Sequence, residues 1–455
     1  MTRRHLSAIL ALLATATVSA PLPGAHAARA SQTPLIFLVI AVDNGHGRAY
    51  LGDPYDRRHR PVRVLDMATG AFLSPVPLPV DNQFSALAVD APAHRVYVAF
   101  DGYAPPDYAP TTGVRTLDTG TGAVVRTVSI VSKADAIAVD PRAGLVYVAS
   151  GGVSPCTISG HCLDTGPNVV YDALISVLDA RRGVRVRTLT VRDVLGALLA
   201  VDGRARRVVL VGAADVVSRA DPGTNVSVLD AFSGRLARRT HLAGGRALRP
   251  VVDEATRRAY VATTMGQGGR VDLFATQDGR RVRTVHLDSA PLALAVGAAV
   301  PGAPSSDYVA VTTLGPVRTV RQTLSNGTPV TGTIAIGRGS LTILDARSGT
   351  LRHRVVVGID PQALAIDERR GWIVVANVGG SGLRGAPYRR GSVNLIDARA
   401  GVMRRNVSLD IIPFNLALDT RTGRAIVSGY NEYTGRNSIQ VVDISRGAIL
   451  RTVSL

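Results

Sequence analysis

Short segments in which apolar and polar residues alternate recur along almost the whole chain. One half of the recurring unit reads Ala-Leu-Ala-Val-Asp, followed by a short turn and Arg-Val-Tyr-Val-Ala, as in Ala86–Phe100 and Ala136–Ser150. Further copies are Leu198–Gly212, Arg249–Thr263, Ala363–Asn377 and Asn415–Gly429, with weaker copies at Val39–Gly52 and Ala293–Thr313. Alternation with a period of two is typical of β-strands, so each copy predicts two antiparallel strands joined by a turn.

A second half-unit follows each of these copies. It reads Val-x-Val-Leu-Asp-Ala-x-x-Gly and continues into an apolar strand containing Arg-Thr-Val, as in Gly113–Ile130, Asn225–Leu242 and Asn437–Leu455. The turn aspartates are Asp66, Asp118, Asp179, Asp230, Asp345, Asp397 and Asp443, with Ala275 in the remaining unit. A glycine comes four residues later in all eight units: Gly70, Gly122, Gly183, Gly234, Gly279, Gly349, Gly401 and Gly447. We therefore expect the aspartate side chain to cap the turn and the glycine to supply a positive φ.

The two halves together predict four short antiparallel strands in each unit. The unit repeats about every 50 residues, which is the length of a propeller blade with modest insertions. The sequence thus predicts an all-β fold, a β-propeller of eight four-stranded blades, with seven blades as the alternative. The first strand of each unit is rich in alanine and should be innermost. Because the chain ends at Leu455 on a complete fourth strand, the ring should close between whole blades.

Two features of the repeat resemble known families. Val374-Val375-Ala376-Asn377 followed by Gly379, and Tyr-Val-Ala at Tyr97, Tyr147 and Tyr260, resemble the YVTN-type β-propeller repeat. That resemblance implies an exported propeller, usually seven-bladed, in a family of mostly unassigned biochemistry. The Leu-Asp-Ala-x-x-Gly turn also resembles repeats of the eight-bladed quinoprotein dehydrogenases. Those repeats carry a tryptophan just after the turn, whereas Trp372 lies elsewhere, so we expect no quinone and no other cofactor.

The N-terminus has the three parts of a secretory signal peptide. Arg3 and Arg4 precede an apolar stretch from Leu6 to Val18, and Ala25-His26-Ala27 fits the small-x-small cleavage rule. We expect a signal peptide at 1–27, a short N-terminal segment at 28–34 and a single propeller domain at 35–455. An uncleaved membrane anchor is the alternative. The mature chain is expected to lack a transmembrane segment and to be secreted, periplasmic or associated with the cell envelope.

The two cysteines, Cys156 and Cys162, lie in one predicted loop. An oxidising compartment favours a local disulfide between them. The alternatives are two free thiols, or a metal site that includes His161, for which three ligands within seven residues make a poor set.

The chain is strongly basic, with a net charge of +18. Such an exported protein should be attracted to anionic polymers or membrane surfaces. Alternatively, the arginines are scattered charges that only solvate the surface, since many lie in turns and on predicted outer strands. The loops between the second and third strands are long and unlike each other, and all should emerge on one face. They cover Asp101–Thr112, Gly151–Asp172, Ala213–Thr224, Leu314–Arg338, Val378–Arg390 and Tyr430–Arg436.

Two of these loops, from neighbouring units, mix tyrosine with arginine and asparagine. This pattern suits stacking and charge recognition of a sugar, a nucleotide strand or an acidic glycan. The candidate binding residues are Arg384, Tyr388, Arg389, Arg390, Tyr430, Asn431, Tyr433 and Arg436. The alternative is that they are ordinary exposed loop residues.

The sequence contains no recognisable catalytic pattern. The nine histidines show no His-x-x-x-His spacing, and the aspartates belong to the turn pattern, so we assign no catalytic residue and no metal ligand. The favoured function is an exported, non-catalytic binding or scaffold protein that uses the loop-rich face. Its partner would be an anionic polymer, a glycan or a protein. The alternative is a propeller enzyme of lactonase or dehydrogenase type acting at the central channel.

Overall fold

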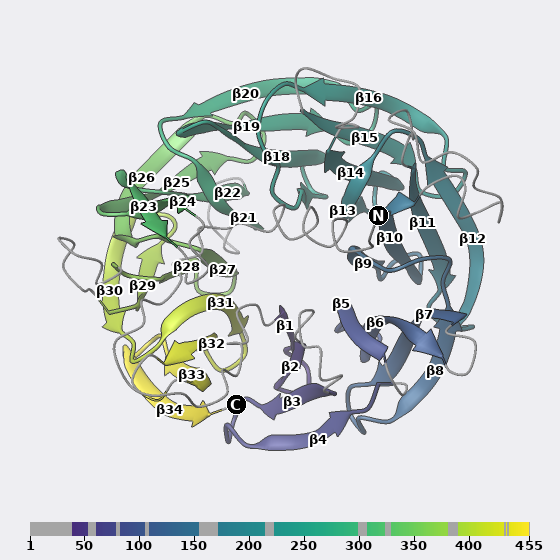
Figure 1. The fold of residues 1–455 in the computed structure, drawn as a ribbon, viewed down its shortest axis with the longest axis horizontal. Coiled ribbons are helices and arrows are strands. Elements are labelled where there is room, and N and C mark those ends of the chain that lie inside the picture. The colour runs from purple at the N-terminus through teal and green to yellow at the C-terminus, as the bar shows by residue number, and fades with distance from the viewer. Residues whose placement is uncertain are drawn as a thin grey trace.

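The fold is a closed ring of eight four-stranded antiparallel sheets (Figure 1). A computed structural model describes residues 39–52, 61–78, 82–104, 109–153, 172–213, 223–298, 307–323, 329–380, 390–431, 434 and 436–454. Each sheet is one blade, and its strands, here also called A to D, follow one another from the axis outward. The predicted all-β propeller with eight blades is confirmed. The described residues contain no helix of the length and apolarity needed to cross a membrane.

The first four blades each consist of four consecutive strands. Blade 1 is β1 (Val39–Asp43), β2 (Arg48–Gly52), β3 (Val62–Asp66) and β4 (Phe72–Val76). Blade 2 is β5 (Asn82–Asp90), β6 (Arg95–Ala104), β7 (Ala109–Asp118) and β8 (Val124–Ser129). Blade 3 is β9 (Ala136–Asp140), β10 (Leu145–Val153), β11 (Asp172–Asp179) and β12 (Val184–Val191). Blade 4 is β13 (Leu195–Asp202), β14 (Arg207–Ala213), β15 (Thr224–Asp230) and β16 (Leu236–Leu242).

The remaining blades follow the same plan, with one insertion in blade 6. Blade 5 is β17 (Val251–Asp253), β18 (Arg258–Met265), β19 (Gly268–Ala275) and β20 (Arg281–Leu287). Blade 6 is β21 (Pro291–Gly297), β22 (Tyr308–Thr313), β25 (Arg338–Asp345) and β26 (Leu351–Ile359). Blade 7 is β27 (Ala363–Asp367), β28 (Trp372–Asn377), β29 (Ser392–Asp397) and β30 (Val402–Ser408). Blade 8 is β31 (Ile412–Asp419), β32 (Arg424–Asn431), β33 (Arg436–Asp443) and β34 (Ala448–Ser454).

The insertion in blade 6 corrects one sequence prediction. The segment Leu314–Arg338 was expected to be a loop, but it holds an antiparallel hairpin of β23 (Val317–Thr323) and β24 (Pro329–Ala335). Asn326-Gly327 lies between these two strands in the sequence, and this dipeptide is the strongest short signal for a hairpin turn. The hairpin was therefore readable from the sequence.

The repeated turn between strands C and D has the predicted chemistry. In blade 2, Asp118 Oδ1 accepts hydrogen bonds from the backbone amides of Gly120 and Thr121 at 3.0 and 2.9 Å. Gly122, four residues after the aspartate, has a φ of 77°. Where Ala275 replaces the aspartate, Asp278 Oδ1 accepts a bond from the Arg280 amide at 2.9 Å. The Asp and Gly positions thus specify the turn locally in each unit.

The ring closes between two whole blades, as predicted from the chain end. Figure 1 shows the yellow strands of blade 8 beside the purple strands of blade 1. Arg424 Nη1 donates to the carbonyls of Met67 and Ala68 at 2.8 and 2.7 Å, and the Thr420 amide donates to Asn44 Oδ1 at 3.1 Å. An apolar cluster joins the same blades across the seam: Ala49, Leu51, Leu65 and Met67 with Ile426, Ile439 and Val441.

A basic side chain on strand D links each of blades 2 to 8 to the blade that follows it around the ring. It comes four residues after the turn glycine, where three of the units read Arg-Thr-Val, and reaches the C–D turn of the next blade. In four blades this side chain donates a hydrogen bond to a backbone carbonyl of the next blade: Arg187 to Phe232, Arg283 to Ser348, His353 to Arg399 and Arg451 to Thr69. In the other three it packs over the turn glycine of the next blade: Arg126 over Gly183, Arg238 over Gly279 and Arg405 over Gly447. Part of the arginine content therefore holds the blades together, so the interpretation as merely scattered surface charge is incomplete.

Substitution of one such arginine should lower stability more than substitution of its neighbour on the same strand. Arg187 donates to the Phe232 carbonyl, and its guanidinium lies 3.9 Å from the centre of the Phe232 ring. Arg187→Ala should lower the free energy of unfolding by about 1–2 kcal/mol. Arg185→Ala, an exposed position on the same strand, should change it by less than about 0.5 kcal/mol. Chemical denaturation of both variants checks this, and equal losses would contradict an inter-blade role for Arg187.

Candidate functional site

The blade topology separates two kinds of connection onto opposite faces of the ring. The A–B and C–D turns share one face, here called the turn face. The B–C connections and the D–A connections between blades share the other, here called the loop face. The predicted binding residues that the structure describes, Arg390, Tyr430, Asn431 and Arg436, belong to the loop face of blades 7 and 8, which are neighbours in the ring (Figure 1). Loops on a rigid scaffold are a frequent location of binding sites.

Half of the predicted binding residues fall within the described ranges. Arg384, Tyr388, Arg389 and Tyr433 lie outside the described residues, as do Cys156 and Cys162 and the predicted signal peptide. The structure places Arg390 just before β29, and Tyr430, Asn431 and Arg436 in strands β32 and β33. Tyr430 and Arg436 were expected in a loop, but the B–C hairpin of blade 8 keeps its ladder as far as the pair Asn431–Arg436.

The described part of this face includes the connection from blade 7 to blade 8. The Leu409 amide donates to the Gly391 carbonyl at 2.8 Å, which ties the D–A connection to the start of β29. The exposed Arg390 and Asp410 form an ion pair at 3.4 Å. In blade 8, Arg436 is exposed and Tyr430 is half-buried, and Asn431 Oδ1 accepts a bond from the Thr434 amide at 3.0 Å. Cationic, amide and aromatic groups from neighbouring blades thus lie on the loop face.

Three carboxyl groups near the loop ends of their strands have raised pKa values. Burial raises the pKa of Asp101, although Lys133 at 3.4 Å opposes the change. Burial also raises the pKa of Asp135, whose Oδ2 accepts bonds from the amides of Gly151 and Ala197 at 2.8 and 3.1 Å. These amides belong to blades 3 and 4, so Asp135 connects two blades.

The third carboxyl, Asp360, precedes strand A of blade 7. Its side chain is almost fully buried, and this burial raises its pKa to about 6, while the side-chain Nε2 of Gln362 donates to Oδ1 at 2.7 Å. Asp360 lies in a different blade from Asp101 and Asp135. Asp101 and Asp135 lie close enough to interact, since the Asp101 charge raises and the Lys133 charge lowers the pKa of Asp135. Within the described ranges, no histidine joins these carboxyl groups in a potential metal-binding cluster.

The outer strands carry positive charge around the ring. Strands β8, β12, β16, β20, β26, β30 and β34 each contain one or two arginines and no aspartate or glutamate. We call their arginines the arginine belt: Arg126, Arg185, Arg187, Arg238, Arg239, Arg281, Arg283, Arg352, Arg354, Arg404, Arg405 and Arg451. Four of them form ion pairs with aspartates outside these strands: Arg281, Arg352, Arg354 and Arg404. Those that bond neutral carbonyls keep their charge and remain a source of positive potential.

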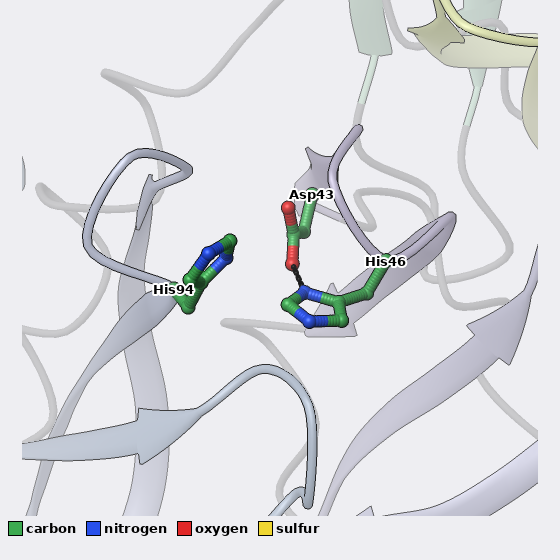
Figure 2. A group of neighbouring side chains, drawn as sticks. All are labelled: Asp43, His46 and His94. Carbon is green, nitrogen blue, oxygen red and sulfur yellow. Dashed lines mark hydrogen bonds and ion pairs between the residues drawn. The ribbon is translucent and has the colours of Figure 1, made fainter.

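The turn face holds a histidine cluster that sequence reasoning missed. Asp43 and His46 lie in the A–B turn of blade 1 and His94 in that of blade 2, and one ligand atom from each lies within 4.8 Å of the others (Figure 2). His46 and His94 are far apart in the sequence, so a search for His-x-x-x-His could not find them. The available signal was that both follow the strand-A aspartate, Asp43 or Asp90, in consecutive repeats.

Comparisons with known proteins support the fold and leave the function open. No protein-family model matches the chain, and no curated protein matches it. The chain is similar to a solved structure of dihydro-heme d1 dehydrogenase NirN in complex with DHE, with a TM-score of 0.53 and 14% identity, covering 95% of this chain and 76% of that one. It is also similar to a eukaryotic initiation factor, with a TM-score of 0.52 and 12% identity, covering 92% and 87%. At these identities the likeness shows a shared propeller fold alone, and the resemblance to the YVTN repeat stays a prediction.

Proposed function

We propose that this chain is an exported, non-catalytic binding protein that holds an anionic polymer, such as an acidic glycan, on its loop face. The observation that carries this proposal is the arginine belt, in which arginine recurs around the ring without any acidic residue on the same strands. A positive rim on seven of the eight blades raises the local concentration of polyanions and speeds their association. Attraction of this kind is long-range and needs no catalytic machinery.

The loop face supplies the groups for short-range recognition. Arg384, Arg389 and Arg390 accompany Tyr388 in the B–C segment of blade 7, and Tyr430 and Arg436 come from the same side of blade 8. Arginine bonds sulfate, phosphate or carboxylate groups, and tyrosine stacks on sugar rings or bases. We infer that the belt attracts the polymer and that these residues hold it.

The test compares two variants that remove equal charge from different places. Heparin serves as the probe and neutral dextran as the control ligand, with the chain from Ala28 onward. Arg384→Ala/Arg389→Ala/Arg390→Ala should weaken heparin binding at least about 10-fold and lessen its dependence on salt, because contacts that release counterions are lost. Arg185→Gln/Arg281→Gln/Arg404→Gln, on the belt, should weaken binding only about 2–3-fold, through slower association.

The outcomes separate a site from diffuse charge. Equal losses in the two triple variants would mean that net charge alone binds heparin, which would overturn the loop-face site. No heparin binding by the unaltered chain at low salt would overturn the proposed function itself. Thermal unfolding of the loop-face variant should match that of the unaltered chain, since substitutions in surface loops usually change stability little.

A further inference from the structure

We propose that Asp43, His46 and His94 form a binding site for a divalent transition-metal ion on the turn face, at the seam between blades 1 and 2. The site lies on the opposite face from the proposed polymer site and is independent of it. Figure 2 shows the Asp43 carboxylate and the two imidazole rings directed toward one space between the two turns. Two imidazoles and one carboxylate are a ligand set that suits Zn²⁺, Fe²⁺ or Ni²⁺ and leaves coordination positions open.

The turn that follows β1 fixes the position of the Asp43 carboxylate. Asp43 is fully buried at the end of β1, and its Oδ1 accepts a bond from the Gly45 amide at 2.9 Å. Its Oδ2 lies 2.8 Å from His46 Nδ1, and the Thr119 hydroxyl is 3.0 Å from the same nitrogen. Burial favours the neutral acid, but the bonds from Thr119, His46 and Gly45 outweigh it, so the pKa of Asp43 is below its usual value. A carboxylate that is hydrogen-bonded to one ring nitrogen of a histidine is a common way of orienting metal-binding histidines in proteins.

The two histidines face each other and remain accessible. The His46 side chain is 33% exposed, His94 is exposed, and their ring centres are 4.7 Å apart with the ring planes at 74°. A metal ion binds imidazole nitrogen and carboxylate oxygen at about 2.0–2.2 Å, so two ligand atoms of a tetrahedral site are about 3.3–3.6 Å apart. The ligand atoms here lie within 4.8 Å of one another, and reorientation of the exposed His94 side chain would bring them to that spacing when an ion binds.

The pairing of the histidines is specific to this seam. His46 comes three residues after the strand-A aspartate of blade 1. At this position the other blades that have the aspartate carry Ala93, Ala143, Ala205, Thr256, Arg370 and Thr422. At the position of His94, one residue further, they have Gly47, Gly144, Arg206, Arg257, Gly371 and Gly423. Histidine thus occupies these positions only in blades 1 and 2, which are neighbours in the ring. His94 also adopts a φ of 53°, a conformation that costs a histidine more than a glycine.

The site can be tested by direct metal binding. The chain from Ala28 onward, without a polyhistidine tag, is stripped with a chelator and titrated with Zn²⁺ by calorimetry about one pH unit above the imidazole pKa of about 6.5. We expect one Zn²⁺ equivalent to bind at this site. His46→Ala and His94→Ala should each lower the affinity at least about 10-fold. His286→Ala, which removes an exposed histidine from β20, should leave it unchanged.

Two further measurements keep the result unambiguous. Zn²⁺ should raise the thermal unfolding midpoint of the unaltered chain but not that of His46→Ala/His94→Ala, because only a bound ion stabilises the folded state. Asp43→Asn preserves a turn-capping oxygen and removes the charge, so it should bind Zn²⁺ more weakly without unfolding. The proposal is overturned if the unaltered chain shows no saturable Zn²⁺ binding, or if binding persists in both single histidine variants.

Discussion

Tyr260→Ala is expected to lower the free energy of unfolding by about 3–5 kcal/mol, the usual cost of truncating a fully buried aromatic residue. Tyr260, in β18, has no exposed surface and packs between blades 5 and 6. Its neighbours include Leu273 in its own blade and Val309 and Leu344 in the next. The cavity would open at a seam between two rigid sheets, where neighbouring side chains have little freedom to collapse into it. Chemical denaturation measures the loss directly.

Replacing the tyrosine by phenylalanine separates the contribution of the hydroxyl group to the free energy of unfolding from that of the aromatic side chain. Tyr260 Oη donates to the carbonyl of Ala346 in the next blade, so Tyr260→Phe should cost about 1 kcal/mol. Tyr97 has the same position in blade 2 and is also buried, but its hydroxyl meets no hydrogen-bond partner among the described residues. Tyr97→Phe should therefore change stability by less than about 0.5 kcal/mol or increase it slightly. Equal costs in the two phenylalanine variants would contradict a stabilising bond from Tyr260 to the next blade.

The blade plan was predictable because its determinants are local. The Asp118 turn, for instance, is specified by bonds between residues two to four positions apart, ending at Gly122. The same signals repeat in every unit, so errors in one copy are corrected by the others. The number of blades and closure between whole blades followed from counting these units. The hairpin β23–β24 was missed because it interrupts the repeat, even though the sequence between its strands contains Asn-Gly at 326–327, a typical hairpin signal.

Contacts between blades were much less predictable than the blades themselves. The Arg-Thr-Val motif was visible in the sequence, but the partner of Arg187 is Phe232, in the next unit. Only the ring geometry shows that the arginine crosses a seam. His46 and His94 are hidden in the same way, since each is unremarkable within its own repeat. Comparing the repeats shows the residues that all units share, whereas His46 and His94 occur at positions where blades 1 and 2 differ from the other units.

The loop face presents the opposite difficulty. Its B–C segments carry no shared pattern, so their residue types suggest chemistry without fixing positions. The structure places Arg390 and Arg436 at one end of neighbouring blades and shows that Arg390 is paired with Asp410. Arg384, Tyr388, Arg389 and Tyr433 lie outside the described residues. Their proposed role therefore depends on the binding experiment with the two triple variants.

Asp360→Asn is expected to raise the free energy of unfolding near pH 7 by as much as about 3 kcal/mol. The Asp360 side chain is almost fully buried, and this burial raises its pKa from the usual 3.8 to about 6. Its carboxylate is therefore ionised in an unfavourable environment at neutral pH. Asparagine has nearly the same shape, carries no charge and can still accept the Gln362 bond to Oδ1. Asparagine also tolerates the φ of 54° at this position well.

The direction of the pH dependence follows from the raised pKa. Below about pH 4 the carboxyl is protonated in both folded and unfolded chains, so Asp360 costs no stability. Between about pH 4 and 6 the folded chain binds the proton more tightly, so the stability of the unaltered protein falls as pH rises, and the penalty is complete above about pH 6. Denaturation at pH 4 and pH 7 should thus show Asp360→Asn and the unaltered chain nearly equal at the lower pH and well separated at the higher. A constant difference at both values would mean that the substitution acts through packing or backbone preference, and that Asp360 is not a buried charge at neutral pH.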